Sequence, residues 1–120
     1  MSGVRLLVVD DDDLQVELVE RALTHDGFEV RGARSMDELA RVAAAFDPEL
    51  ILLDVNMPDA PNDRTLAIAR AACPAAGVVL YSAWEESKLR KLAAELGADG
   101  FISKSESVFG IAAKLRTFKR

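Results

Sequence analysis

Short apolar runs alternate along the chain with longer segments whose apolar residues recur at helical spacing. The runs lie at residues 4–9, 28–32, 50–54, 78–81 and 101–103. They are rich in Val, Leu and Ile without strict alternation, as expected for strands that are buried on both faces of a sheet. This pattern predicts five strands, each followed by a helix.

The clearest helix is predicted after the second run. The capping-box sequence Ser35-Met36-Asp37-Glu38 stands before it. Apolar residues then recur at i, i+3, i+4 and i+7, namely Leu39, Val42, Ala43 and Phe46. Asp47-Pro48 should end this helix, because the residue before a proline disfavours helical geometry.

The first helix should begin after Asp12 or Asp13 as its cap and end near Gly27. Its apolar residues are predicted to form one stripe with two neighbours beside it. The stripe is Leu14, Leu18 and Ala22, and the neighbours are Val19 and Leu23.

Three more helices are expected further along the chain. The third covers about residues 63–72, and the fourth has apolar positions from Leu89 to Leu96 and closes at Gly97. The last should begin with Ser105 as its cap. Its inward residues would be Val108, Ile111, Ala112 and Leu115.

Five strand–helix units in 120 residues fit one domain spanning residues 1–120, because single cores organise about 100 to 200 residues. Crossovers between parallel strands are right-handed in nearly all cases. The expected fold class is therefore α/β, with a doubly wound, five-stranded parallel sheet. The site of such a sheet lies beyond the carboxyl ends of its strands, where the strand order reverses.

The first polar side chains after four of the runs are the candidate site residues. Asp10 and Asp11 follow the first run, Asp54 ends the third, Ser82 follows the fourth and Lys104 follows the fifth. One aspartate by itself is more often a helix cap or a solvated loop charge. Four strand ends that present such side chains at one edge indicate a functional site.

Three of these side chains, Asp10, Asp11 and Asp54, should crowd one another. At about 5 Å and an effective dielectric constant of about 20, each like-charged pair costs roughly 3 kcal/mol, so three pairs cost on the order of 10 kcal/mol. This is comparable to the stability of a whole domain, about 5 to 15 kcal/mol. Either one carboxyl group keeps its proton or a cation lies among them.

Four aspartates at residues 10–13 account for most of the net charge. Fifteen basic and twenty acidic residues give −5, and without these four the balance is 15 minus 16, or −1. This excludes a broad nucleic-acid-binding surface.

The first residues lead directly into a short apolar run, which predicts neither a signal peptide nor a membrane span and favours the cytoplasm. The single cysteine, Cys73, is expected to be a small buried side chain.

The candidate residues suit phosphoryl chemistry. Carboxylate oxygens without nearby His or Cys favour Mg²⁺ or Mn²⁺ over zinc, and Mg²⁺ commonly completes its shell with phosphate oxygens. Lys104 would neutralise phosphoryl oxygens and Ser82 would donate a hydrogen bond. Asp54 is the best candidate for the nucleophile, because Asp10 and Asp11 are adjacent and better placed to hold metal.

At these residues the chain resembles the receiver domain of bacterial two-component response regulators, especially the single-domain chemotaxis type. Val8-Val9-Asp10-Asp11 is similar to the family's acidic pair and Asp54-Val55-Asn56-Met57-Pro58 to its phosphoacceptor segment. Tyr81-Ser82-Ala83 is similar to its switch site and Phe101-Ile102-Ser103-Lys104 to its final lysine segment. The ordered set spans essentially the whole chain, and it implies the strand order 2-1-3-4-5.

The resemblance implies that Asp54 accepts phosphate from a histidine kinase or a histidine phosphotransfer protein. Mg²⁺ or Mn²⁺ would bind Asp11, Asp54 and the backbone carbonyl of Asn56, and Asp10 would contribute directly or through a water. Lys104 would pair with the phosphoryl group.

The resemblance also implies how the signal leaves the domain. Ser82 and Phe101 would move as switch residues. The output face would comprise the fourth helix, fifth strand and fifth helix, about residues 85–119, and would contact an unidentified target protein. The resemblance is also compatible with dimerisation of the phosphorylated domain.

The chain departs from the family pattern in two loops. Residues 59–64 lack the glycine that usually follows Met-Pro, and Ser105 replaces the usual proline, so the common cis peptide is not expected. Asn56, Ala83 and Trp84 are expected to modulate access to the phosphorylation site. Bulky Trp84 would slow hydrolysis of the acyl phosphate, or else be an exposed aromatic or a partner anchor.

The leading interpretation is a switch that binds other proteins and is not a turnover enzyme, since the chain stops after its predicted fifth helix. A pseudo-receiver that acts as a phosphorylation-independent docking module is the alternative, favoured by the two unusual loops. A flavodoxin-like electron carrier would need a glycine-rich anion loop where residues 10–13 are acidic. A haloacid-dehalogenase-type phosphatase would need its nucleophile at the first strand.

Overall fold

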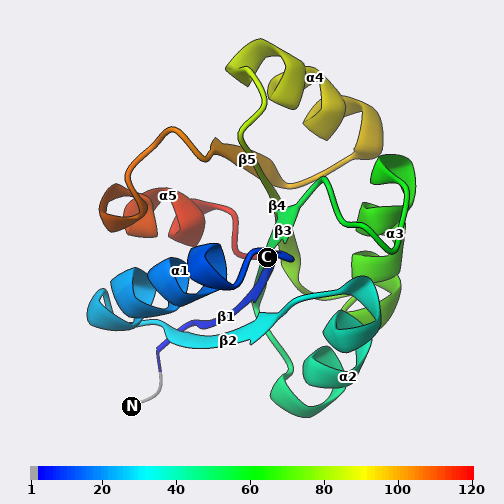
Figure 1. The fold of residues 1–120 in the computed structure, drawn as a ribbon. Coiled ribbons are helices and arrows are strands. Elements are labelled where there is room, and N and C mark those ends of the chain that lie inside the picture. Colours follow the sequence, from blue (N-terminus) through cyan, green and yellow to red (C-terminus); the bar gives the residue numbers. More distant parts are fainter. Residues whose placement is uncertain (1–2) are drawn as a thin grey trace.

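The strands form one parallel sheet in the order β2-β1-β3-β4-β5 (Figure 1). The computed structural model describes residues 3–120, and within them the sheet has five strands. These are β1 (Arg5–Val9), β2 (Glu29–Ala33), β3 (Leu50–Asp54), β4 (Gly77–Ser82) and β5 (Gly100–Ser103). The predicted fold class and strand order are confirmed.

Helices connect the strands and cover both faces of the sheet. They are α1 (Asp13–His25), α2 (Met36–Phe46), α3 (Asn62–Ala72), α4 (Glu86–Leu96) and α5 (Ala112–Thr117), with a 3-10 turn, η1 (Val108–Gly110), before the last. Figure 1 shows α1 and α5 on one side of the sheet and α2 and α3 on the other. Buried residues of α4 belong to the same core as those of α2 and α3.

Each face of the sheet has its own apolar core, and alternate residues of β1 contribute to each. Leu6 and Val8 pack with α1 and α5, whereas Leu7 and Val9 pack with α2, α3 and α4. All residues of β3 are buried. The central strands β1 and β3 are therefore held on both faces, which fixes the positions of the side chains at their carboxyl ends.

Four helix boundaries lie where the sequence predicts them, at the start of α1, at both ends of α2 and at the end of α4. Asp12 caps α1 by accepting hydrogen bonds from the N–H groups of Leu14 and Gln15, and Ser35 caps α2 by accepting one from the N–H of Glu38. Asp47 ends α2 at φ 53° and Gly97 ends α4 at φ 75°. Gly97 suits this left-handed geometry because it has no Cβ.

In the predicted stripe of α1, Ala22 is buried, whereas Leu14 and Leu18 are 63% and 40% exposed. The side chains of Val16, Val19 and Leu23 have helical spacing of their own and are the ones that are buried. The two leucines are left on the surface of the helix.

The predicted start of the last helix at Ser105 is also wrong. The hydroxyl groups of Ser105 and Ser103 hydrogen-bond each other at 2.7 Å, and Ser107 caps η1 instead. Regular α-helix begins only at Ala112. The inward residues are as predicted, because Ile111, Ala112 and Leu115 are buried and Val108 packs against them.

Three smaller expectations can be compared with the structure. Cys73 is a free, buried thiol, as predicted. Within residues 3–120 there is no cis peptide bond, and no helix has both the length and the hydropathy needed to cross a membrane. The predicted absence of a signal peptide concerns Met1 and Ser2 in part, and these two lie outside the described residues.

Candidate functional site

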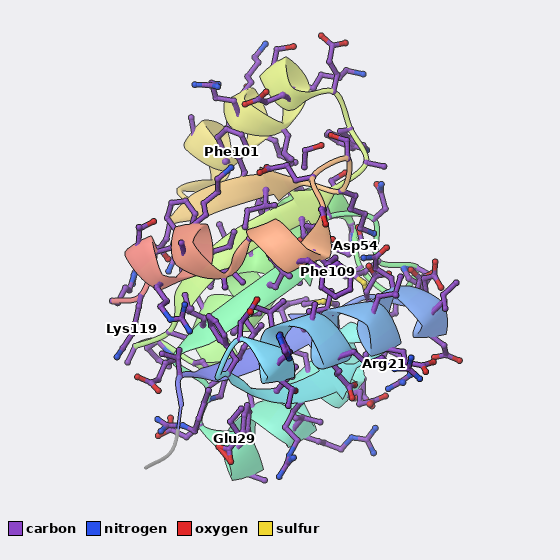
Figure 2. All side chains as sticks on the ribbon, turned by 90° about the vertical axis from the view of Figure 1, so that its left-hand side faces the viewer. Arg21, Glu29, Asp54, Phe101, Phe109 and Lys119 are labelled. Carbon is purple, nitrogen blue, oxygen red and sulfur yellow. The ribbon has the colours of Figure 1, made fainter. Side chains whose placement is uncertain are left out.

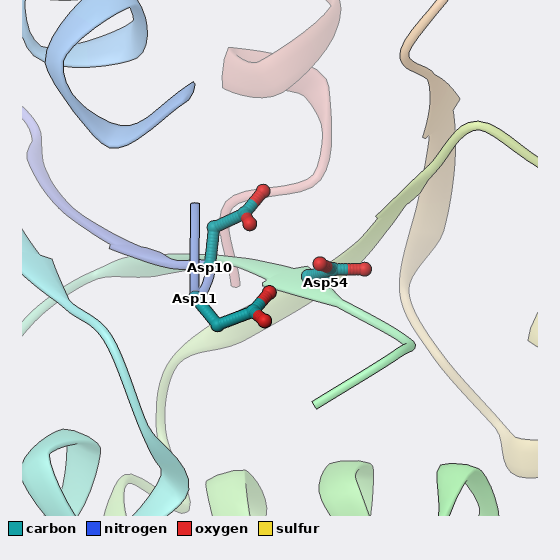
Figure 3. Close-up of side chains that lie close together, drawn as sticks. All are labelled: Asp10, Asp11 and Asp54. Carbon is teal, nitrogen blue, oxygen red and sulfur yellow. The ribbon is translucent and has the colours of Figure 1, made fainter. Parts of the chain in front are cut away.

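Three carboxylates meet where β1 and β3 end. Asp10 and Asp11 follow β1, Asp54 ends β3, and the two strands are paired. Ligand oxygens from the three residues lie within 4.8 Å of one another, and Figure 3 shows the side chains close together. Asp10 and Asp54 are buried, whereas Asp11 is exposed. The cluster therefore reaches solvent through Asp11.

Lys104 brings a positive charge to this cluster from the end of β5. Its Nζ lies 2.8 Å from Oδ2 of Asp10 and 3.4 Å from Oδ2 of Asp54. Its backbone N–H donates to the carbonyl of Ser82 at 2.7 Å, which continues the pairing of β5 with β4. Lys104 thus supplies part of the positive charge that the clustered acids require.

The two buried carboxylates are oriented by nearby backbone N–H groups. The N–H of Asp12 donates to Oδ1 of Asp10, and the N–H of Asn56 donates to Oδ1 of Asp54, both at 3.0 Å. Each bond closes a short turn in which an aspartate accepts from the residue two positions later. In each residue the other oxygen, Oδ2, is the one that faces Lys104.

Burial and neighbouring charges shift the pKa values of Asp54 and Lys104. Burial raises the pKa of Asp54 and the charge of Asp10 adds to this, while the N–H of Asn56 and the Lys104 ammonium oppose it. Burial acts to lower the pKa of Lys104, but the hydrogen bond to Asp10 and the attraction of Asp54 outweigh it, so this pKa is raised. Lys104 is therefore an ammonium at neutral pH.

The predicted switch residues lie on β4 and β5. Ser82 is fully buried and its Oγ accepts the N–H of Trp84 at 3.1 Å, so the hydroxyl is held within its own loop. Phe101 is half-buried and packs against the core formed with α2, α3 and α4. The guanidinium of Arg90 lies 5.3 Å from the centre of the Phe101 ring.

The residues expected to affect access differ in their surroundings. Ala83 and Trp84 line a hollow of about 460 Å³ that also contains residues of the loop after β5. Trp84 is half-buried, with Nζ of Lys88 5.9 Å from its ring centre. Asn56, two residues after Asp54, is exposed.

Tyr81 is a further part of the site that the sequence analysis missed. Nζ of Lys104 lies 5.5 Å from its ring centre, and its hydroxyl accepts a hydrogen bond from Nε2 of Gln15 at 3.0 Å. Burial raises the pKa of Tyr81 to about 12, so it stays a neutral phenol. A signal existed, because the single tyrosine stands directly before Ser82 at the end of a strand.

The donor set fits a hard divalent cation. Oxygens bound to one octahedral Mg²⁺ lie about 3 to 4 Å apart, given bonds of about 2.1 Å. The oxygens of Asp10, Asp11 and Asp54 lie within 4.8 Å, so a small contraction would bring them to this spacing. Asp11 is exposed and gives the cation a route from solvent.

Comparison with known proteins shows similarity over most of the chain. The model of the response regulator receiver domain matches residues 6–116. The transcriptional regulatory protein PrrA of Mycobacterium tuberculosis is 33% identical over 120 residues, which are 100% of this chain and 52% of PrrA. The chain therefore spans about half the length of this relative.

Solved structures share the fold. The chemotaxis response regulator CheY4 of Vibrio cholerae superposes with a TM-score of 0.84 at 20% identity, covering 98% of this chain and 99% of CheY4. A response regulator from Burkholderia pseudomallei superposes with a TM-score of 0.81 at 26% identity, covering 96% of this chain and 68% of that protein. The latter was crystallised with a phosphorylated aspartic acid, a calcium ion and citrate.

Proposed function

The chain belongs to the response regulator receiver domain family, and on this basis we propose that it is a phosphorylation-activated switch of a two-component phosphorelay. One observation carries the proposal most directly. Asp54 lies buried at the end of β3, with its ligand oxygen within 4.8 Å of those of Asp10 and Asp11 and Nζ of Lys104 3.4 Å away. A nucleophile, a set of cation ligands and a fixed ammonium are thus together.

In the proposed reaction, a carboxylate oxygen of Asp54 attacks the phosphorus of a phosphohistidine. The P–O bond forms as the P–N bond breaks, and the released imidazole takes up a proton. The N–H of Asn56 holds Oδ1 of Asp54 and so orients the carboxylate. Lys104 is within reach of Asp54 and would transfer its hydrogen bond to an oxygen of the new acyl phosphate.

We propose Mg²⁺, or Mn²⁺, as the cofactor, held by Asp11, Asp54 and the backbone carbonyl of Asn56, with Asp10 acting directly or through a water. When bound, the metal would offset the negative charge of the phosphoryl oxygens. The oxygen donor set supports this assignment. The related Burkholderia protein, with its phosphorylated aspartic acid and calcium ion, supports it further.

The proposed phosphodonor is a histidine kinase or a histidine phosphotransfer protein. Such a donor must cover the rim of the site, and α1 begins only two residues after Asp11. Leu14 and Leu18 of α1 are exposed, and so is Phe109 of η1, at 69%. η1 packs against α1, and Phe109 is seen next to that helix in Figure 2. We propose that these three apolar side chains contact the donor.

The proposed output surface comprises α4, β5 and α5, and its partner is an unidentified target protein or a second phosphorylated copy. Arg90 of α4 stacks on Phe101 of β5, so an inward movement of Phe101 would remove this contact and change the surface. The domain would act by binding and not by turnover. The free, buried thiol of Cys73 is compatible with the proposed cytoplasmic location.

Incubation with phosphoramidate or acetyl phosphate and Mg²⁺ tests the proposal. Intact-mass spectrometry should show one added phosphate on the wild type and none on Asp54→Asn. Asp63→Asn is a matched control, because Asp63 is an exposed aspartate in the first turn of α3, and it should label like the wild type. Equal labelling of Asp54→Asn would overturn the assignment.

The alternative is a pseudo-receiver that docks without phosphorylation. It draws on the two loops that depart from the family pattern, residues 59–64 without a glycine and Ser105 in place of the usual proline. Titration with Mg²⁺ separates the two functions, because the fluorescence of Trp84, the single tryptophan, reports changes near Ser82. No response in the millimolar range would favour the docking module.

A further inference from the structure

One side chain, that of Asp59, ties the loop after Asp54 to the start of α2. Its carboxylate accepts the N–H of Met36, at 3.2 Å to Oδ1 and 3.1 Å to Oδ2, and the N–H of Asp37 at 3.3 Å to Oδ2. The same helix already has a local cap, in which Oγ of Ser35 accepts a hydrogen bond from the backbone of its first turn. The first turn of α2 is therefore capped twice, once from its own segment and once from another loop.

The start of α2 is directly connected to the end of β1. The carbonyl of Ala33, three residues before Met36, accepts the N–H of Asp10 at 3.0 Å. Asp59 therefore binds a segment that is itself fixed to the acidic end of β1.

The other end of the loop that Asp59 ties contains Asn56, whose backbone carbonyl is a proposed ligand of the metal. Asn56 precedes Asp59 by three residues, and its N–H donates to Oδ1 of Asp54. Met57 lies between them and is buried in the same core as Met36. The loop is thus held at two points, by the side chain of Met57 in the core and by the carboxylate of Asp59 at α2.

We infer that Asp59 is a positioning residue, which holds the segment containing Asn56 against the acidic cluster so that its carbonyl can serve a divalent cation. This inference rests on the proposed function, since it assumes that the cluster binds such a cation. The loop lacks a glycine, and Pro61 at φ −63° starts α3 immediately after it. The three hydrogen bonds of Asp59 set the path of this loop between the phosphorylation site and α3.

Three variants separate positioning from general loss of stability. Asp59→Ala removes the tie, and Ser35→Ala removes the other cap of the same helix, which should lower the melting temperature comparably. Asp59→Asn keeps one oxygen acceptor and should behave like the wild type. Titration with Mg²⁺, followed by the fluorescence of Trp84, should give a dissociation constant about tenfold higher for Asp59→Ala and unchanged for Ser35→Ala.

A second measurement does not need the metal. Hydrogen exchange of the Asn56 amide, followed by NMR without Mg²⁺, should be faster in Asp59→Ala than in the wild type and unchanged in Ser35→Ala. The inference is overturned if Asp59→Ala leaves both quantities unchanged, or if Ser35→Ala changes them equally. If Mg²⁺ does not change the fluorescence of the wild type, the proposed function fails, and so does the part of the inference that concerns the cation. The exchange rate of the Asn56 amide still decides whether Asp59 holds the loop.

Discussion

Lys104 bridges Asp10 and Asp54, with its Nζ 2.8 Å from one carboxylate and 3.4 Å from the other. One ammonium, directly after β5, therefore pairs with two buried acids at the ends of β1 and β3 and offsets one of their two negative charges. The third acid, Asp11, is exposed, and water screens its charge. With one ammonium against three carboxylates, the cluster keeps an excess of negative charge, which favours a divalent cation.

Replacing Lys104 by Ala should destabilise the metal-free protein by about 3 kcal/mol, because a buried ion pair loses one partner and the carboxylates remain. Urea unfolding in EDTA measures the effect. Mg²⁺ should then stabilise the variant more than the wild type, since the cation no longer competes with an ammonium for the same oxygens.

Lys114→Ala is the matched control for this change. Lys114 also forms an ion pair at 2.8 Å, with Glu106, but the two side chains are 46% and 39% exposed. Its loss should cost less than about 1 kcal/mol. Equal losses in the two variants would show that burial of the Lys104 pair adds nothing.

Asp11→Asn should raise the stability of the metal-free protein and reduce the stabilisation that Mg²⁺ provides. In EDTA it relieves repulsion within the cluster and should raise stability by about 1 kcal/mol. With Mg²⁺ at ten times its dissociation constant, the wild type should gain about 1.4 kcal/mol, and the variant should lose most of this gain. Thermal unfolding at several Mg²⁺ concentrations measures both, and an undiminished gain in the variant would remove Asp11 from the ligand set.

Asp99 should make the free energy of unfolding depend on pH in the acidic range. Burial alone would raise its pKa, but the N–H of Val78 at 2.7 Å and Arg120 and Arg70 at 2.9 and 3.3 Å outweigh this and lower the pKa. The folded state therefore holds the charged form more strongly than the unfolded chain does. This stabilisation is present above the unfolded pKa of about 3.9 and is lost as the pH falls through the lower, folded pKa.

Asp99→Asn should cost about 2 kcal/mol at pH 7 and progressively less below about pH 4, as measured by urea unfolding at each pH. The control is Asp47→Asn, since the Asp47 side chain is 91% exposed and Asn tolerates its left-handed backbone. The control should stay within about 0.5 kcal/mol of the wild type. A constant difference between wild type and Asp99→Asn across the pH range would contradict the assignment.

The exposed apolar side chains beside the site, Leu14 and Phe109 among them, should affect the rate of phosphotransfer only when the phosphodonor is a protein. Leu14→Glu and Phe109→Ala should slow phosphotransfer about tenfold or more, which corresponds to the loss of about 1.4 kcal/mol of binding energy. Phosphotransfer profiling with a panel of autophosphorylated histidine kinases supplies the donor. Labelling by phosphoramidate should be unchanged, so a variant that slows both reactions would point to damage at the site and not to docking.

The ends of β1 and β3 could be predicted because both strands are almost entirely buried. An uninterrupted apolar run that stops at Asp10 or Asp54 marks both the end of the strand and the start of the site. The start of the last helix could not, because Ser103, Ser105 and Ser107 are equally good caps by local sequence. The choice among them depends on backbone pairing between Lys104 and Ser82, which only the folded sheet provides.

The same limit applies to side chains whose partners are distant in sequence. Leu14 and Val16 both belong to stripes with helical spacing, and only packing against the sheet decides which stripe is buried. Asp59 caps a helix that begins 23 residues earlier, so no local capping pattern identifies it. Tyr81 and Lys104 likewise meet because β4 and β5 are neighbours.

The sheet gives the two kinds of charge different freedom to move. β1 and β3 each pair with a strand on both sides, whereas β5 has four residues and, within the described chain, pairs with β4 alone. Edge strands exchange and fray more easily than central ones. The acids therefore follow the strands that are held on both sides, whereas the ammonium follows the edge strand, which can open more easily.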